Sequence, residues 1–344
     1  MAPDSLAAVL TATGAAVLAA VLLSATWDRG TGRRRAALRT ATIGLCLTTA
    51  LTAAGIWINR QVDAWTSWSA LIGADSTAGV ATQPAGAAGR TGGRIITVTV
   101  TGTASGLTLP VQAYLPAAYD NQPTTRFPVI EALHGYPGSP ASWLNHLAAV
   151  RHLDHEINAG RMAPTVVLFP LQTPSALLDT ECTNLSHGPQ AETFLTVDVP
   201  AAVETHLHIR TDRGAWGLIG YSAGGYCATN LALRHPDRYA AAASLSGYAN
   251  PGITIGDGSE HTLNDDTWRL RHLPNPPVAL YLSSGRADRQ PHHDAATLSH
   301  LARPPLTVTT SSVNGGGHSI AVWEAAEAPA FDWLSSWLGR PATP

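Results

Sequence analysis

The stretch from Leu218 to Cys227 reads LIGYSAGGYC and places Ser222 inside a G-x-S-x-G motif. A serine among small residues can stand at a sharp turn from a strand into a helix, where its hydroxyl is exposed as a nucleophile. The apolar run AWGLIG precedes the motif, and the amphipathic run AGGYCATNLALRH overlaps and follows it. The N-terminus of such a helix points partial positive charge at a developing oxyanion. This context favours a nucleophile over an incidental serine in a glycine turn.

A serine nucleophile needs a base and an acid that orients the base, and candidates for both follow Ser222. His318 lies in the loop VNGGGHS after the strand-like run LTVTTSS, and Asp288 lies in GRADRQ after VALYLSS. In open α/β sheets, ligands bind at the ends of successive strands. We therefore expect a triad of Ser222, His318 and Asp288. Asp294 also follows VALYLSS, so the choice between these two acids stays open.

The oxyanion formed by such a serine needs two backbone N–H donors. One is the residue after the nucleophile, Ala223, and the other comes from the loop after the third strand. That loop follows the run FPVIEAL and begins His134-Gly135-Tyr136. We expect the Tyr136 N–H to be the second donor, and we expect His134 to hold this loop rather than act as a base.

These residues require a scaffold, and from Arg94 onward runs typical of strands alternate with runs typical of helices. Two β-branched runs near the start predict antiparallel strands, and short apolar runs further along predict parallel strands buried on both faces. The alternation predicts one three-layer α/β sandwich with a mostly parallel sheet over residues 94–344. The helical spacing is seen in SWLNHLAAVRHLDHEI, ETFLTVDVPAAVETHLH, AGGYCATNLALRH and AAEAPAFDWLSSWL.

The first sixty residues contain two runs without ionisable side chains, at positions 6–27 and 41–59. Each is long enough to span a bilayer as a helix. The arginines between them would remain cytoplasmic. Residues 1–60 are thus predicted to be a two-helix membrane anchor with a cytoplasmic Arg-rich loop, which puts the later domain on the extracytoplasmic side of the cell membrane. A cleaved signal peptide is disfavoured because the sequence MAPDS lacks a positive n-region.

Residues 61–93 are small and rich in glycine, which predicts a flexible linker between anchor and domain. Charged residues make up 13% of the 344-residue chain and the formal net charge is −3, so nucleic acid is not expected as a partner. No phosphate-binding or dinucleotide motif and no metal-ligand pattern is present, and we expect no cofactor and no metal. The chain has no lysine, which is typical of high-GC genomes such as those of actinobacteria.

Cys182 and Cys227 are the only cysteines after the anchor, and in an oxidising compartment they form a candidate disulfide. The separation of the two sulfurs cannot be read from the sequence. Cys182 lies in the long segment LQTPSALLDTECTNLSHGPQ, which could shape a substrate pocket. Asp179 and Glu181 in this segment could contact substrate, with solvation of the loop as the simpler interpretation.

The motifs HGYPGSPASW, ETFLT, GYSAGGYCATNLALRHPDRY and NGGGHS, in this order, resemble the putative-esterase (esterase D-like) branch of the α/β-hydrolases, a branch that includes the secreted mycolyltransferases of mycobacteria. The resemblance extends from about Arg94 to Gly339. It implies a nucleophile at Ser222, a base at His318, donors at Tyr136 and Ala223, and extracytoplasmic acyl-ester chemistry. Mycolyltransferases usually have Asp where His134 stands and a glutamate as the triad acid, so the match is better to the broader esterase branch.

We therefore expect a membrane-tethered serine esterase or acyltransferase that works through an acyl-enzyme. Its partners would be a small-molecule or lipid ester, a sugar or lipid alcohol as an alternative acceptor to water, and the lipid bilayer. A non-catalytic envelope-binding protein with the same fold is the alternative from another class, because fold does not fix function.

Overall fold

The computed structural model describes residues 2–3, 5–62, 65, 68 and 92–343. The chain divides into two compact units, Met1–Thr77 and Ala78–Pro344, and each is described here by itself. Most of the predicted linker, residues 61–93, lies outside the described residues.

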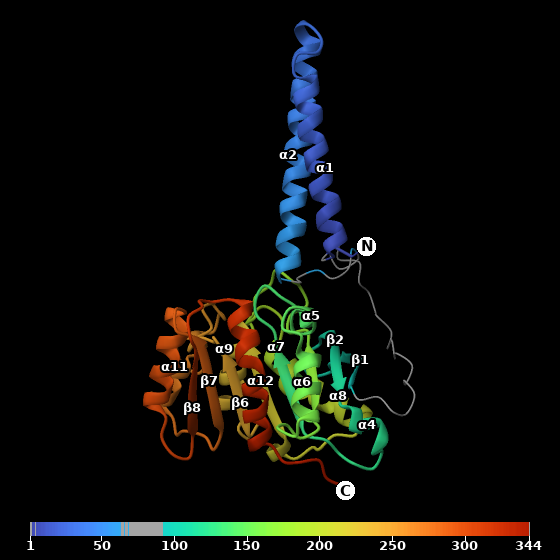
Figure 1. The fold of residues 1–344 in the computed structure, drawn as a ribbon. Coiled ribbons are helices and arrows are strands. Elements are labelled where there is room, and N and C mark those ends of the chain that lie inside the picture. Colours follow the sequence, from blue (N-terminus) through green and yellow to red (C-terminus); the bar gives the residue numbers. More distant parts are fainter. Residues whose placement is uncertain (1, 4, 63–64, 66–67, 69–91, 344) are drawn as a thin grey trace. The chain divides into compact units, whose positions relative to one another are not determined.

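The N-terminal unit is a pair of long helices that lie side by side, α1 (Leu6–Thr26) and α2 (Gly32–Val62) (Figure 1). Both are long and apolar enough to cross a membrane. Ser5 caps α1 by accepting a hydrogen bond from the Ala8 N–H at 3.1 Å. Their lengths fit the requirement of about 20 residues for a spanning helix.

The structure corrects the predicted Arg-rich loop. Because α2 begins at Gly32, the arginines from Arg33 to Arg39 lie in its first turns, and only a short turn joins the helices. Arginine is a good helix former, so the basic segment extends the helix beyond its apolar part. The Asp28 carboxylate in the turn pairs with the guanidinium groups of Arg35 and Arg39.

The second unit contains one eight-stranded sheet with the strand order β1-β2-β4-β3-β5-β6-β7-β8. β1 and β2 form an antiparallel pair, β2 is antiparallel to β4, and the remaining neighbours are parallel. The strands are β1 (Arg94–Thr101), β2 (Thr108–Leu115), β3 (Val129–Leu133), β4 (Val166–Pro170), β5 (Trp216–Tyr221), β6 (Ala241–Leu245), β7 (Ala279–Gly285) and β8 (Thr307–Val313). The predicted mostly parallel sheet is confirmed.

Helices cover both faces of this sheet and form the other two layers (Figure 1). Side chains of α5, α6 and α12 pack on one face, and those of α8, α9 and α11 pack on the other. Along β3, Ile130 faces the first set and Leu133 the second, as the two-residue period of a strand requires. The helices are α4 (Ala117–Asn121), α5 (Pro140–Asn145), α6 (Ala149–Asn158), α7 (Ala191–Thr193), the π-helix η1 (Phe194–Asp198), α8 (Val199–His206), η2 (Arg213–Ala215), α9 (Ala223–Arg234), η3 (Ser259–His261), α10 (Asp266–His272), α11 (Arg289–Leu301) and α12 (Ile320–Trp337).

Two elements differ from the sequence-based expectation. The segment AAASL forms the interior strand β6, although its alanines carry little strand signal. Small side chains suit this position because α9 and α12 both contact β6, one on each face. The single helix expected around residues 142–157 is divided into α5 and α6, with Ala148 in the left-handed conformation between them.

Candidate active site

Ser222 occupies the turn between β5 and α9, with backbone angles of φ 55° and ψ −123°. A non-glycine residue in this region is strained and persists only where its surroundings hold it. The Ser222 N–H donates to the Leu245 carbonyl at 2.9 Å, and the Ser222 carbonyl accepts from the Gly225 N–H at 2.9 Å. A Cβ on Gly220 would overlap the Gly224 carbonyl, so the turn can close only with glycine there. This turn places the Ser222 side chain at the C-terminal edge of the sheet, where it is buried.

The structure joins the three predicted triad residues in one hydrogen-bonded chain. Ser222 Oγ lies 2.7 Å from His318 Nε2, and His318 Nδ1 lies 2.8 Å from Asp288 Oδ2. A carboxylate can only accept, so Nδ1 carries the proton and Nε2 presents a lone pair to the serine hydroxyl. This is the tautomer that a general base requires.

The two acids that the sequence left open have different partners. Asp288 binds the imidazole, and its side chain is 8% exposed. Asp294 lies within α11, where Oδ2 accepts from the Ala249 N–H at 3.1 Å and Oδ1 accepts from the Gln290 side chain at 2.9 Å. Of the two acids, Asp288 therefore contacts the imidazole of His318, whereas Asp294 binds the backbone of Ala249.

Two aromatic side chains flank the imidazole of His318. The Trp323 ring meets it edge to face, with centroids 5.0 Å apart, and in turn stacks on Tyr221 at 4.7 Å. The Tyr248 ring lies 5.7 Å away, and its hydroxyl is 3.4 Å from His318 Nε2. Both rings therefore contact the imidazole of His318, which stays 32% exposed.

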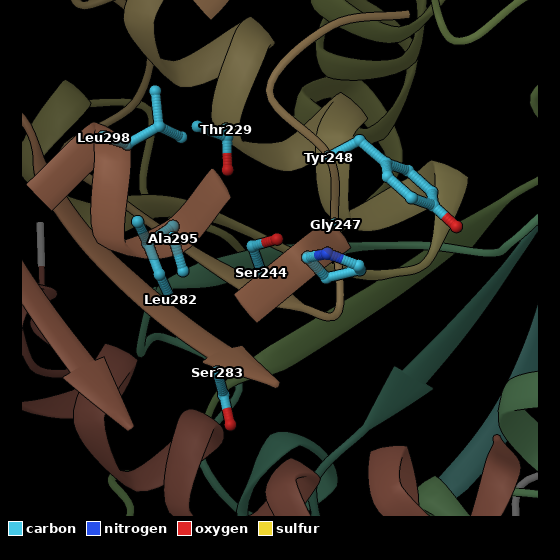
Figure 2. Close-up of a pocket in the computed structure, with 9 residues that line it drawn as sticks. Thr229, Ser244, Gly247, Tyr248, Leu282, Ser283, Ala295 and Leu298 are labelled. Atoms are coloured by element: carbon cyan, nitrogen blue, oxygen red, sulfur yellow. The ribbon is translucent and has the colours of Figure 1, made fainter. Parts of the chain in front are cut away.

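Tyr248 is a site residue that the sequence-based prediction missed. It follows β6, the strand that was also missed, and therefore lies at the same edge of the sheet as Ser222. Its ring points away from Thr229 and Leu298, with which it lines a small cavity between α9, β7 and α11 (Figure 2). A prediction that β6 is a strand would have placed Tyr248 at the same edge of the sheet as Ser222.

The predicted oxyanion donors lie beside Ser222. Ala223 is the first residue of α9, and its N–H has no hydrogen-bond acceptor within the described part of the chain. A Cβ on Gly135 would lie 3.3 Å from the Ser222 Cβ, which shows how closely the loop carrying Tyr136 approaches the nucleophile. The Tyr136 hydroxyl donates to the Leu177 carbonyl at 2.9 Å, which ties this loop to the segment after β4.

His134 holds the same loop, as expected. Its Nδ1 lies 2.8 Å from the Gly135 carbonyl, and its backbone exchanges hydrogen bonds with the Gln172 side chain. Burial lowers the pKa of His134 to about 4, so the ring is neutral at pH 7. A neutral, buried ring away from Ser222 Oγ is a structural element of the loop.

Cys182 and Cys227 form a disulfide with an S–S distance of 2.07 Å and a Cα–Cα distance of 5.6 Å. Cys227 lies in the second turn of α9, so the disulfide fixes the long segment after β4 to the helix that begins at the nucleophile. Glu181 and Cys182 both have positive φ angles, 42° and 53°. The disulfide thus fixes a segment with left-handed backbone conformation next to the loop that begins at His134 and carries Tyr136, here called the oxyanion loop.

The segment after β4 and the oxyanion loop enclose a pocket that includes Tyr136 and Ala223. Asp179 and Glu181 also line it. Burial raises the pKa of Asp179, and burial together with the charge of Asp179 raises the pKa of Glu181 well above its usual value. The pocket therefore combines the predicted oxyanion donors with two carboxyl groups.

A family model described as "Putative esterase" matches residues 103–339, more than half of the chain. The chain belongs to this family. The matched residues include every member of the hydrogen-bonded chain and both predicted oxyanion donors, so the esterase family match covers the whole of the candidate site.

Relatives of this chain include an uncharacterized protein of Corynebacterium glutamicum, 27% identical over 241 residues that cover 65% of this chain and 56% of the relative. The diacylglycerol acyltransferase/mycolyltransferase Ag85B of Mycolicibacterium smegmatis is 34% identical over 93 residues, or 24% of this chain and 28% of the relative. The chain thus spans little more than half of the first relative's length.

Among solved structures, an S-formylglutathione hydrolase of Agrobacterium tumefaciens superimposes with a TM-score of 0.63 at 15% identity, covering 76% of this chain and 99% of the other. At this identity the likeness establishes the fold alone. The α/β-hydrolase fold expected from the sequence is confirmed.

Proposed function

We propose that this protein is a membrane-tethered serine esterase or acyltransferase that works through a covalent acyl-enzyme. The observation that carries the proposal is the chain of hydrogen bonds from Ser222 through His318 to Asp288, at the tip of a strained turn. A protein that only binds ligands has no need for a serine held in a strained conformation against an oriented imidazole.

In the proposed reaction, Ser222 Oγ attacks the ester carbonyl carbon while His318 Nε2 takes its proton. The carbonyl oxygen becomes an oxyanion that the N–H groups of Ala223 and Tyr136 stabilise. Collapse of this intermediate breaks the ester C–O bond, and the leaving alkoxide takes the proton from Nε2–H. The acyl group remains on Ser222, and Asp288 stabilises the imidazolium that forms in each step.

Water or a second alcohol then attacks the acyl-enzyme, with His318 again accepting a proton. Water releases a carboxylic acid, and a sugar or envelope-lipid alcohol yields a new ester; in both cases Ser222 regains its proton from His318. The family match supports the esterase outcome, and the partial similarity to a mycolyltransferase supports the transferase outcome. Product analysis with and without an added sugar or glycerolipid alcohol separates the two.

The decisive experiment is labelling of the full-length protein in detergent with a fluorophosphonate probe. We expect stoichiometric labelling of the wild type, and none of Ser222→Ala or His318→Ala, because the probe reacts only with an activated serine. A folded wild-type protein that the probe does not label would refute the triad and favour a binding protein on the same fold.

We also propose that α1 and α2 span the membrane, and that the esterase domain lies on the extracytoplasmic side. The arginines at the start of α2 support this orientation through the positive-inside rule. A disulfide within the esterase domain supports an oxidising compartment. Protease added to intact spheroplasts should remove the esterase domain, and resistance of that domain until the membrane is lysed would overturn the orientation.

A further inference from the structure

The pocket beside the oxyanion donors is acidic in a way that the proposed reaction does not use. Asp179 and Glu181 supply its carboxyl groups, and His134 supplies the only titratable nitrogen among its lining residues. Since His134 is neutral at pH 7, no positive charge in the lining balances the two acids. Burial disfavours the ionised form of both acids, and their ionised form so close to a developing oxyanion would hinder ester hydrolysis unless the substrate brings a compensating positive charge.

Two atoms of this lining are enclosed without a partner. Glu181 Oε2 and His134 Nε2 are buried, and neither has a hydrogen-bond partner among the residues that the structure describes. His134 Nδ1 donates to the Gly135 carbonyl, so Nε2 of the neutral ring carries a lone pair and can only accept. Buried polar atoms are normally satisfied, and an unsatisfied pair of acceptors in one pocket indicates a missing donor.

The loop that carries these acids is built to hold them in place. The Glu181 N–H donates to Asp179 Oδ1 at 3.1 Å, and the next residue, Cys182, is fixed to α9 by the disulfide. Thr183 Oγ1 donates to the Thr180 carbonyl at 2.7 Å and closes the turn around Glu181. The backbone that carries the Glu181 carboxyl group is therefore held by hydrogen bonds on both sides and by the adjacent disulfide.

We infer that Asp179 and Glu181 form a specificity subsite for a protonated amine on the acyl part of the substrate. An ammonium group offers three N–H donors and no acceptor. Its positive charge would counteract the burial that raises the pKa of Asp179 and of Glu181, and would favour the ionised carboxylates that accept its hydrogen bonds. This inference rests on the proposed serine esterase activity and adds the substrate class.

The position of the pocket decides which part of the ester carries the amine. The lining includes Tyr136 and Ala223 but not His318 or Tyr248. The leaving alcohol must lie next to His318 Nε2 to receive its proton, so it points away from this pocket. The carbonyl oxygen and the acyl group lie on the pocket side.

The test uses the full-length protein in detergent and three pairs of ethyl esters. Glycine, β-alanine and 4-aminobutanoic acid esters carry an ammonium where propanoic, butanoic and pentanoic acid esters carry a methyl group. Within each pair the shape is nearly the same, and across the series the ammonium moves away from the carbonyl. The readout is the ratio of kcat/KM for the charged ester to that for its neutral partner.

We expect one charged ester to be preferred by the wild type, and Glu181→Gln to lower the ratio for that pair at least tenfold. Asp179→Asn should lower it less, because Asp179 already accepts from the Glu181 N–H. The matched control is Asp237→Asn, an exposed acid that follows α9 at the end opposite Ser222, and its ratio should equal that of the wild type. Comparison of variants removes the intrinsic reactivity difference between the paired esters.

An unchanged ratio in Glu181→Gln, or a wild type that prefers every neutral ester, would overturn the subsite. If Glu181→Gln does not fold, Asp179→Asn is judged by the same ratio, and an unchanged value there has the same meaning. Failure of the proposed activity gives a different result, because neither ester series would then be hydrolysed and the fluorophosphonate probe would not react.

Discussion

Ser222 has two contrasting sides. On one side, His318 and Asp288 satisfy each other's hydrogen bonds, and Trp323 packs against the imidazole. On the other side, the Ala223 N–H, Glu181 Oε2 and His134 Nε2 are without partners within the described residues. The side chains that act on one another in the proposed reaction are already hydrogen-bonded to one another. The unpartnered groups are those that we propose contact the substrate. On this second side, a bound substrate would supply the missing hydrogen-bond partners.

The largest effect is expected on the paired side. Asp288→Asn should lower kcat about 10³- to 10⁴-fold, because an amide at this position no longer selects the Nδ1–H tautomer. Asp294→Asn is the matched control, and we expect less than a tenfold change because Asp294 binds only the Ala249 N–H and the Gln290 side chain. Steady-state hydrolysis of a neutral ester measures both, and the reverse ranking would exchange the roles of the two acids.

On the side of Ser222 that carries Glu181, the disulfide between Cys182 and Cys227 stabilises the folded domain. Replacement of Cys182 and Cys227 together by serine opens a loop with a sequence separation of 45 residues. Chain-entropy considerations give a loss of about 4 kcal/mol in the free energy of unfolding. Denaturant unfolding monitored by tryptophan fluorescence tests this. Cys46→Ser, which removes the free cysteine of α2, should leave the value unchanged.

The oxyanion loop can be displaced without removal of any hydrogen-bonding side chain. In Gly135→Ala the new Cβ would lie 2.7 Å from the Tyr221 ring and 3.3 Å from the Ser222 Cβ. The loop must shift, and loss of one aligned donor should lower kcat about 10²-fold. Gly317→Ala, beside His318, has open space around the new methyl group and should change kcat less than threefold. Equal effects from both would contradict the proposed place of the oxyanion.

The smallest effect is expected from Tyr248→Phe. Loss of a hydroxyl 3.4 Å from His318 Nε2 should lower kcat about three- to tenfold, in line with one weak hydrogen bond of about 1 kcal/mol. The pH dependence of kcat should shift as well, since a purely structural role of the ring would leave it unchanged. A variant identical to the wild type in both respects would show that Tyr248 only packs against the imidazole.

Some of the site could be predicted because its supporting strands carry a recognisable signal, apolar residues in β5 and β-branched residues in β8. β5 and β8 were recognisable as strands, so the positions of Ser222 and His318 after them indicated the same edge of the sheet. β6 was missed because the segment AAASL lacks the residues that favour strands, and Tyr248 was missed with it. Local composition reports strand propensity, but the need for small side chains between α9 and α12 is a tertiary requirement.

Other features depend on distances that a sequence does not contain. Asp288 and Asp294 are six residues apart, and only the start of α11 after Asp288 decides which one can face His318. The partner of Cys182 and the burial of Glu181 depend on how the segment after β4 folds back over α9. The sequence marked these residues as candidates, and the fold assigned their neighbours.

Ser222 lies in the stretch of chain between Cys182 and Cys227, which the disulfide closes into a loop. This has a consequence for peptide mapping. The chain has no lysine, so trypsin cuts only after arginine, and its limit peptides here are residues 162–210 and 214–234. The first contains Cys182, and the second contains both Ser222 and Cys227. A probe on the nucleophile should therefore appear in mass spectra on a two-chain peptide that separates only on reduction, so one digest reports the reactive serine and its crosslink together.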